Sequence, residues 1–127
     1  MIGGWLPGNG RRSDTVGSLL LGYHDEEGVL RFAGAAGSGL RDADLAAFSS
    51  ALARIATDEC PFGSENRSLI PRQARWVVPC VVVEVRFTEW TSAGIIRNPV
   101  YLGVRDDKDP ATITRESPSP RRPLPGT

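Results

Sequence analysis

The order in which two apolar periodicities occur along this 127-residue chain constrains its fold more than any other feature. Residues 17–36 contain two apolar runs, SLLLGYH and GVLRFAGA, separated by the turn segment Asp25-Glu26-Glu27-Gly28. Two such runs around a short turn ending in glycine are typical of a β-hairpin. The opening run, IGGWL, is expected to form a further strand. The first third of the chain therefore predicts three strands.

After the segment GSGL, apolar residues recur at intervals of three and four instead of two. Asp42 or Asp44 is a suitable N-cap for a helix. We expect this helix to continue to about Ala56 and to bury one stripe formed by Leu45, Phe48, Leu52 and Ile55. A proline- and glycine-containing segment then ends the periodicity.

Alternation returns between Arg75 and Trp90 and predicts a half-buried strand. One face is expected to carry Val81, Val83, Val85 and Phe87. The opposite face is expected to carry Val82, Glu84, Arg86 and Thr88. A turn at TSAG leads into a last strand, IIRNPVYLGVR, whose buried face is expected to carry Ile96, Val100, Leu102 and Val104. Its other face is expected to carry Arg97, Tyr101, Gly103 and Arg105.

The predicted order is three strands, one helix and two strands. Five strands with a helix between the third and the fourth are the layout of the OB-fold, a partly open barrel that commonly binds nucleic acids. We therefore predict a mainly β domain, a five-stranded OB-fold barrel, over residues 1–115. The Pro-rich segment 116–127 is predicted to be a disordered tail. A mixed α+β sandwich is the alternative.

Composition limits the functions available to this chain. Basic and acidic residues balance at 15 each, so bulk charge gives no argument for binding nucleic acid or membrane. Lys108 is the only lysine, which restricts lysine-based covalent catalysis to that position. Cys60, Cys80 and the single histidine, His24, do not form a convincing zinc motif, and we predict no metal site. Without a signal or membrane segment, we expect a reduced, cytoplasmic protein.

A mixed charge run, Arg105-Asp106-Asp107-Lys108, directly follows the last predicted strand. Arginine offers a fork for phosphate oxygens, lysine offers a point charge, and a neighbouring carboxylate can hold either cation in place. By spacing alone, a solvated charged turn is the simpler interpretation.

Four segments occur in an order that changes this interpretation: IGGWLPGNGRR, GSLLLGYHDEEGVLRFAGAAGSGL, PRQARWVVPCVVVEVRFTEWT and YLGVRDDKDP. Together they resemble the C-terminal domain of bacterial ATP-dependent DNA ligases of the ligase C and ligase D types. In that family the domain is an OB-fold. The last segment is similar to nucleotidyltransferase motif VI, Arg-x-Asp-Lys, which places Arg105, Asp107 and Lys108 on the motif.

The resemblance implies a role shared with a separate nucleotidyltransferase domain, which carries the lysine that attacks ATP and binds most of the ATP and Mg²⁺. Motif VI would orient the departing pyrophosphate, with Arg105 and Lys108 as charge stabilisers and Asp107 holding one of them. The nucleophile's Lys-x-Asp-Gly motif is missing, because Lys108 is followed by Asp109-Pro110. We therefore expect the isolated chain to be inactive alone, either as a piece cut from a larger ligase or as a natural domain with its partner elsewhere.

Contact with nicked double-stranded DNA is the second expected activity. Arg11 and Arg12 lie in a glycine-rich loop, and the other candidates on the last strand are Arg97, Asn98 and Tyr101. A solvent-exposed loop and a solvent-facing strand are the simpler interpretations. The sequence also departs from the family, which usually has lysine where Ala35 stands and often His-Pro in place of Asn98-Pro99.

Other prominent residues have structural interpretations. We expect Trp5, Trp76 and Trp90 to pack on the core or the barrel rim, although tryptophans can stack on bases. Cys60 and Cys80 are expected to be packing residues, and the glycines of FAGAAGSGL to serve turn geometry.

Two functional hypotheses follow. The first is a monomeric, nucleoid-associated domain of a DNA ligase that acts in DNA repair, recombination or replication. The second is a stand-alone OB-type module that binds nucleic acid or protein and performs no chemistry. A small hydrolase is disfavoured because no paired nucleophile and base are visible.

Overall fold

The computed structural model describes residues 1–8, 16–64 and 67–105. Its elements follow the order β1 (Ile2–Pro7), β2 (Val16–His24), β3 (Leu30–Ala36), α1 (Asp42–Ala53), β4 (Ala56–Thr57), a 3₁₀ turn (Arg67–Leu69), β5 (Arg75–Val81), β6 (Val83–Arg86) and β7 (Val100–Val104). If β5 and β6 count as one bent strand and the two-residue β4 is set aside, the predicted order of three strands, one helix and two strands is confirmed. The predicted tail lies outside the described residues.

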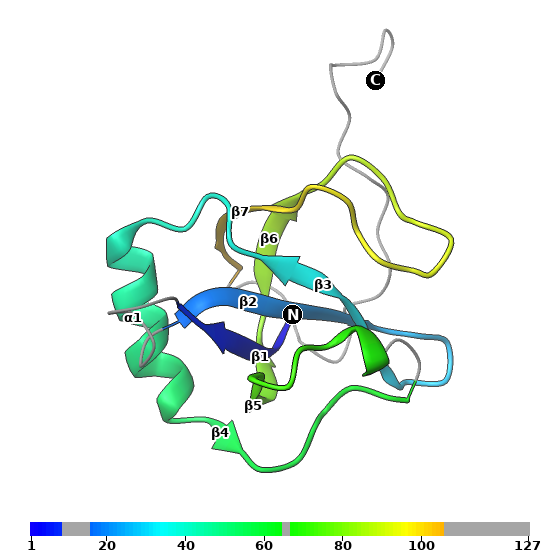
Figure 1. The fold of residues 1–127 in the computed structure, drawn as a ribbon, viewed down its shortest axis with the longest axis horizontal. Coiled ribbons are helices and arrows are strands. Elements are labelled where there is room, and N and C mark those ends of the chain that lie inside the picture. The colour runs from blue at the N-terminus through cyan, green and yellow to red at the C-terminus, as the bar shows by residue number, and fades with distance from the viewer. Residues whose placement is uncertain (9–15, 65–66, 106–127) are drawn as a thin grey trace, which may run out of the picture.

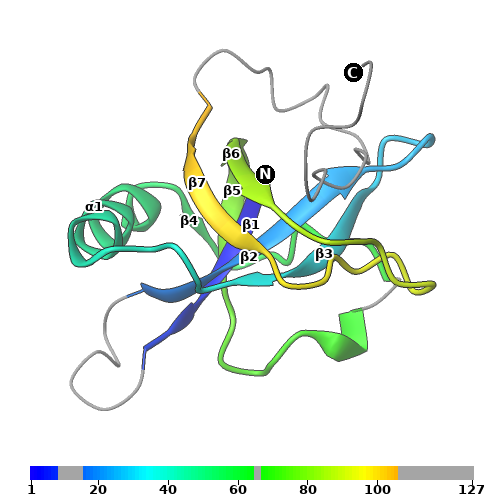
Figure 2. The ribbon, with the colours of Figure 1, turned by 90° about the horizontal axis from the view of Figure 1, so that it is seen from above.

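Two antiparallel sheets make up the fold. The larger has the order β3-β2-β1-β5-β4 and the smaller pairs β6 with β7. Figures 1 and 2 show β6 and β7 crossing over the larger sheet, with α1 at one end of it. The sheets are joined by a parallel bridge between Ser38 and Val100 and by a 2.9 Å hydrogen bond that the Ile96 N–H donates to the Ala33 carbonyl. The strands therefore curve into a partly open barrel.

Both faces of the larger sheet are covered, which explains the uninterrupted leucine run of β2. Leu19 and Leu21 belong to a core cluster inside the barrel, together with Phe48 and Leu52 of α1. Leu20 points to a second cluster on the opposite face, built around Phe62, Leu30 and Phe32. A strand buried on both faces needs no polar alternation.

The expected strand from Arg75 to Trp90 is divided at Val82, and its two halves belong to different sheets. Val81, Val83, Val85 and Phe87 all contact the barrel core, as expected. The expectation that Val82 faces outward is wrong, because Val82 is buried in the second cluster. Phe62, from a segment without any periodicity, supplies the apolar cover on that side.

The helix starts and ends differently from the prediction. Arg41 is its N-cap residue, and the Asp44 carboxylate accepts a 2.9 Å hydrogen bond from the Arg41 N–H. Asp44 therefore satisfies the helix start from the third helical position instead of serving as the cap. The helix ends at Ala53, before the predicted Ala56, because the chain there turns into β4.

The expected structural roles of the tryptophans are confirmed. Trp5 and Trp90 are half-buried against the barrel core, and Trp76 is half-buried against the second cluster. Cys60 also packs on the second cluster. The expectation for Cys80 is wrong, because Cys80 is exposed. Among the residues described, no helix is long and apolar enough to cross a membrane.

Candidate functional site

Arg105, the first residue of the expected motif VI, follows β7 and is fixed at two points. Its backbone N–H donates a 2.8 Å hydrogen bond to the Val82 carbonyl, so it extends the pairing of β7 with the β5–β6 strand. Its Nη1 donates a 2.6 Å hydrogen bond to the Glu84 Oε1. The side chains of Arg105 and Glu84 are 36% and 47% exposed. The pair therefore lies at the surface of the domain.

Several expected site residues lie outside the described residues. These are Asp107 and Lys108 of motif VI, and Arg11 and Arg12 of the N-terminal loop. Their assignments remain predictions.

A surface depression of about 650 Å³ adjoins β7 on the side of the α1 start. It is lined by Gly39, Leu40, Arg41, Asp44, Tyr101, Leu102 and Gly103. Gly103, one of these lining residues, is paired with Glu84 across the two-stranded sheet. Its lining combines one cation, one carboxylate and apolar surface.

The expectation that Tyr101 faces solvent is wrong. Tyr101 is only 8% exposed and its ring contacts Phe48 of α1 edge to face, with centroids 5.6 Å apart. The register of β6 and β7 shifts between Glu84 and Val85, so that Leu102 is an extra residue and the simple alternation fails. Burying the tyrosine ring removes more apolar surface from water than burying Leu102 would. Leu102 and Val104 are instead 49% and 47% exposed.

This burial changes the acid–base behaviour of the phenol. Loss of hydration raises the pKa of Tyr101 above its ordinary value, and the nearby negative charge of Asp44 raises it further. Tyr101 is therefore a neutral structural residue and does not belong to an exposed DNA-contacting face.

The expectation that Arg97 and Asn98 lie on the last strand is wrong, because β7 begins only at Val100 and both residues lie in the loop between β6 and β7, at the end of this pair opposite to Arg105. The loop is closed by hydrogen bonds from the Thr88 N–H to the Arg97 carbonyl (3.0 Å) and from the Arg97 N–H to the Glu89 carbonyl (2.9 Å). The Arg97 guanidinium forms a 3.0 Å ion pair with Glu89, with both side chains more than half exposed. Arg97 and Arg105 therefore lie beyond opposite ends of β7. The structure therefore separates the expected DNA-contacting cation from the expected motif VI cation.

Asn98 adopts a left-handed backbone conformation with φ of 52°, which asparagine tolerates better than most residues. Its side-chain amide donates a 3.4 Å hydrogen bond to the Thr88 hydroxyl. Asn98 thus has a structural reason to stand in this loop.

Ala35 is exposed, and its segment lies beside the segment that contains Arg97 and Asn98. The segments 33–38 and 96–101 run side by side and parallel, joined by the Ile96–Ala33 hydrogen bond and by a 2.8 Å bond from the Tyr101 N–H to the Ser38 carbonyl. Ala35 lies between these two contacts on one segment, and Arg97 lies between them on the other. Positions 35 and 97 therefore lie on neighbouring segments of the chain.

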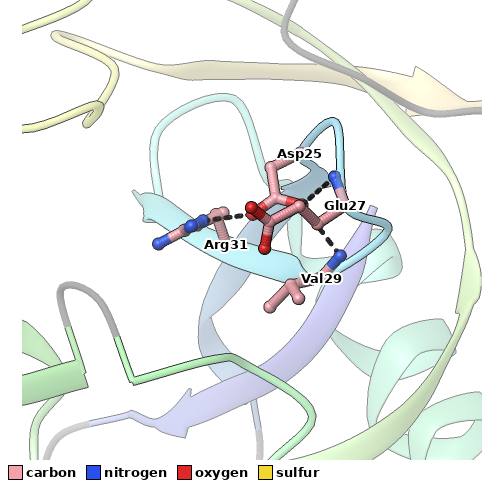
Figure 3. Close-up of polar contacts among 4 residues, drawn as sticks. All are labelled: Asp25, Glu27, Val29 and Arg31. Atoms are coloured by element: carbon pink, nitrogen blue, oxygen red, sulfur yellow. Dashed lines mark hydrogen bonds and ion pairs between the residues drawn. The ribbon is translucent and has the colours of Figure 1, made fainter.

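The turn between β2 and β3 is organised by Asp25 (Figure 3). Its carboxylate accepts 2.9 Å hydrogen bonds from the backbone N–H groups of Glu27 and Val29, and a 2.6 Å bond from the Nε of Arg31. The bond from Val29 contributes most to lowering the pKa of Asp25, and the Arg31 guanidinium adds to it against the opposing effect of desolvation. Aspartate at a turn start is a known signal for such bonds, but this role of Asp25 was not predicted from the sequence.

The described residues contain no group of three or more histidine, cysteine, aspartate or glutamate side chains that could hold a metal ion. Two cysteine or carboxylate ligands alone would not make a stable site for zinc.

Comparison with known proteins agrees with this architecture. The family model described as the C-terminal region of ATP-dependent DNA ligases matches residues 12–108. The multifunctional non-homologous end joining DNA repair protein LigD of Mycobacterium tuberculosis is 42% identical over 116 residues, which are 91% of this chain and 15% of that protein. The chain thus spans about a seventh of the length of this relative.

Two solved structures extend the comparison. The ligase domain of M. tuberculosis LigD superimposes with a TM-score of 0.80 at 42% identity, covering 91% of this chain and 37% of that one. A mycobacterial DNA ligase D complexed with ATP and MES gives a TM-score of 0.76 at 39% identity, covering 91% and 36%.

The domain is a bent, partly open β-barrel of OB type. One helix follows its third strand, and a cation, Arg105, follows its last strand. Because the family model and these relatives match most of its length, the chain belongs to the family of C-terminal regions of ATP-dependent DNA ligases.

Proposed function

We propose that this chain works with a nucleotidyltransferase domain in ATP-dependent DNA ligation and supplies motif VI to the adenylylation step. Arg105 and Lys108 would face the β- and γ-phosphates of ATP while a lysine of the nucleotidyltransferase domain attacks the α-phosphate. They would stabilise the charge that develops on the departing pyrophosphate. Fixed cations in a site closed to water act much more strongly than cations in bulk water.

The position of Arg105 is the observation that supports this proposal most. The family model's match extends to residue 108, so Arg105, Asp107 and Lys108 all lie within it. The Arg105 guanidinium lies at the surface at the end of β7 and is held by Glu84. A motif that acts on a second domain must be exposed in the isolated domain.

The β7 surface beside Arg105 also suits contact with another domain. Leu102 and Val104 are about half exposed immediately before it. Contiguous exposed apolar surface can mark a site that a partner covers. We propose that the nucleotidyltransferase domain covers them when it closes.

ATP is a substrate of this reaction, and the complex of a mycobacterial DNA ligase D with ATP supports its use by the family. We propose that most contacts to ATP, and to Mg²⁺ as its counter-ion, come from the nucleotidyltransferase domain. The residues of this chain would contribute positive charge beside the pyrophosphate.

Binding of nicked double-stranded DNA is the second part of the proposal. Arg97 and Asn98 would contact the phosphate backbone from the β6–β7 loop, and Arg11 and Arg12 from the N-terminal loop. The similarity to a non-homologous end joining DNA repair protein supports a function in DNA repair. Such work requires access to chromosomal DNA, so we propose a cytoplasmic, nucleoid-associated location.

A domain exchange tests the proposed function. The matched part of the M. tuberculosis LigD ligase domain would be replaced by this chain, and sealing of a nicked duplex with ATP would be measured. We expect the hybrid to seal nicks, whereas the same ligase without any C-terminal region does not. Circular dichroism and melting of the hybrid establish that it is folded.

A folded hybrid that forms no enzyme–AMP and seals nothing would contradict the proposal. If this chain alone then bound nicked DNA, the result would favour a stand-alone binding module.

A further inference from the structure

The carboxylate of Glu84 holds the guanidinium of Arg105 at 2.6 Å. Hydrogen bonds between two charged groups at such a distance are among the stronger ones in proteins. The two residues are 21 positions apart in the sequence, so only the pairing of β6 with β7 brings them together.

The register of these strands explains why the two side chains meet. Glu84 is paired with Gly103, which has no side chain, and a Cβ placed on Gly103 would meet nothing within 4 Å. The surface over Gly103 is therefore open. The Arg105 side chain reaches across it to Glu84, as diagonal neighbours on a sheet can.

The backbone of Arg105 is fixed as well, by its hydrogen bond to Val82. An arginine side chain on a surface loses much conformational freedom when it is held in one geometry. If a carboxylate already holds the side chain, this conformational freedom is lost before the phosphate binds and not during binding. The guanidinium is then already oriented for the phosphate.

We propose that Glu84 is a positioning residue for Arg105 in the adenylylation step. The inference rests on the proposed function, because it assumes that Arg105 acts on the pyrophosphate. Glu84 itself would contact neither ATP nor DNA. The planar fork of arginine allows one guanidinium to bind a carboxylate and a phosphate oxygen through different N–H groups.

A second arginine–glutamate pair in the same chain provides a matched control. Arg97 and Glu89 are also exposed and 3.0 Å apart, but they lie in the loop at the opposite end of the β6–β7 pair. Glu89→Ala therefore removes a carboxylate from a similar surface ion pair without altering the neighbourhood of Arg105.

The experiment measures enzyme–AMP formation by the full chain joined to the mycobacterial nucleotidyltransferase domain, over a range of ATP concentrations. The variants are Glu84→Ala, Glu84→Gln, Glu89→Ala, Arg105→Ala and the double variant Glu84→Ala with Arg105→Ala. Sealing of a nick that already carries AMP is measured in parallel, because that step does not release pyrophosphate. Melting temperatures of all variants report on folding.

We expect Glu84→Ala to lower the rate constant of adenylylation at saturating ATP by about fivefold, the upper range for an exposed ion pair. Glu84→Gln keeps an oxygen that accepts from Arg105 and should retain most of the rate. Glu89→Ala should match the parent. In the Arg105→Ala background, Glu84→Ala should have no further effect, as expected for residues that act through one another. Sealing of the pre-adenylylated nick by the Glu84→Ala variant should be unchanged.

Two results would overturn the inference while leaving the proposed function intact. The first is a loss with Arg105→Ala but none with Glu84→Ala. The second is a Glu84→Ala loss of equal size with and without Arg105, which would show that Glu84 acts independently. An Arg105→Ala variant with the parent's rate would instead contradict the role of motif VI itself, and the inference with it.

Discussion

The ring of Tyr101 packs edge to face on the ring of Phe48, with centroids 5.6 Å apart and planes inclined by 80°. This contact joins β7 to α1, two elements that are far apart in the sequence. It also fixes the strand that leads into Arg105, because Tyr101 and Arg105 belong to the same extended segment. The position of the expected motif VI cation thus depends on a buried tyrosine.

Tyr101 should titrate above the ordinary pKa of tyrosine, which is about 10. Burial raises its pKa, and the Asp44 charge raises it further. Because the pKa of Tyr101 is higher in the folded than in the unfolded state, the protonated phenol contributes to the stability of the fold. This contribution is complete below about pH 10 and is lost as pH rises through the folded pKa. Ultraviolet titration of tyrosinate measures the pKa of Tyr101, and the Tyr101→Phe variant assigns the signal.

Asp44→Asn should shift the Tyr101 titration to lower pH but leave it above the ordinary value, since burial is the larger cause. A Tyr101 signal that titrates with the ordinary pKa would show that the ring is hydrated in solution.

Asp25→Asn should weaken the turn between β2 and β3 and remove a source of acid sensitivity. The Val29 and Glu27 hydrogen bonds and the Arg31 ion pair favour the charged carboxylate, so the pKa of Asp25 is lowered below 3.8. Its contribution to stability is therefore present above about pH 4 and is lost as pH falls through the folded pKa. Urea unfolding of parent and variant across the acid range measures the difference between them.

Glu26→Gln removes a charge from the same turn and leaves the Asp25 hydrogen bonds in place. Equal acid dependence of the Asp25→Asn variant and the parent would refute the assigned role of Asp25.

Gly39→Ala should lower the free energy of unfolding by roughly 2 kcal/mol. Gly39 has φ of 88°, where residues with a Cβ are strained, and its Cβ would collide with the Tyr101 carbonyl oxygen. Gly37→Ala is the matched control, since its Cβ would make only ordinary contacts at 3.6 Å. Chemical denaturation of both variants provides the comparison, and equal losses would argue against strain at Gly39.

Ala35→Lys should strengthen binding of nicked duplex DNA. Ala35 is exposed beside Arg97, so the new cation would extend the proposed DNA-contacting surface. One added phosphate contact should steepen the dependence of log affinity on log salt by about one. Fluorescence anisotropy at several salt concentrations measures this slope.

Ala46→Lys, an equal change of charge on the exposed face of α1, is the control for bulk charge. If both variants gain the same slope, the surface around Arg97 has no special part in DNA binding.

Local patterns predicted much of this fold. The β2–β3 hairpin followed from two apolar runs around a turn, and the helix followed from the spacing of Phe48 and Leu52. The inward face of residues 81–87 followed from strict alternation. Each of these depends on residues that are close in sequence.

The errors arose where distant residues decide. The face of β7 depends on the extra residue at Leu102, which a sequence pattern does not reveal. Val82 is buried because Phe62 covers the second face of the sheet. The Arg105–Glu84 pair depends on the strand register, so motif similarity could indicate Arg105 but not its partner. The positions of Lys108 and Asp107 remain predictions from the motif.

The decisive measurement is the rate of enzyme–AMP formation by the hybrid ligase with Lys108 and with Lys108→Ala. We expect the variant to form enzyme–AMP about 100-fold more slowly, because a cation beside the departing pyrophosphate is lost. Its affinity for nicked DNA and its melting temperature should stay close to those of the parent. Adenylylation at the parent's rate by a folded Lys108→Ala hybrid would contradict the proposal that this chain supplies motif VI.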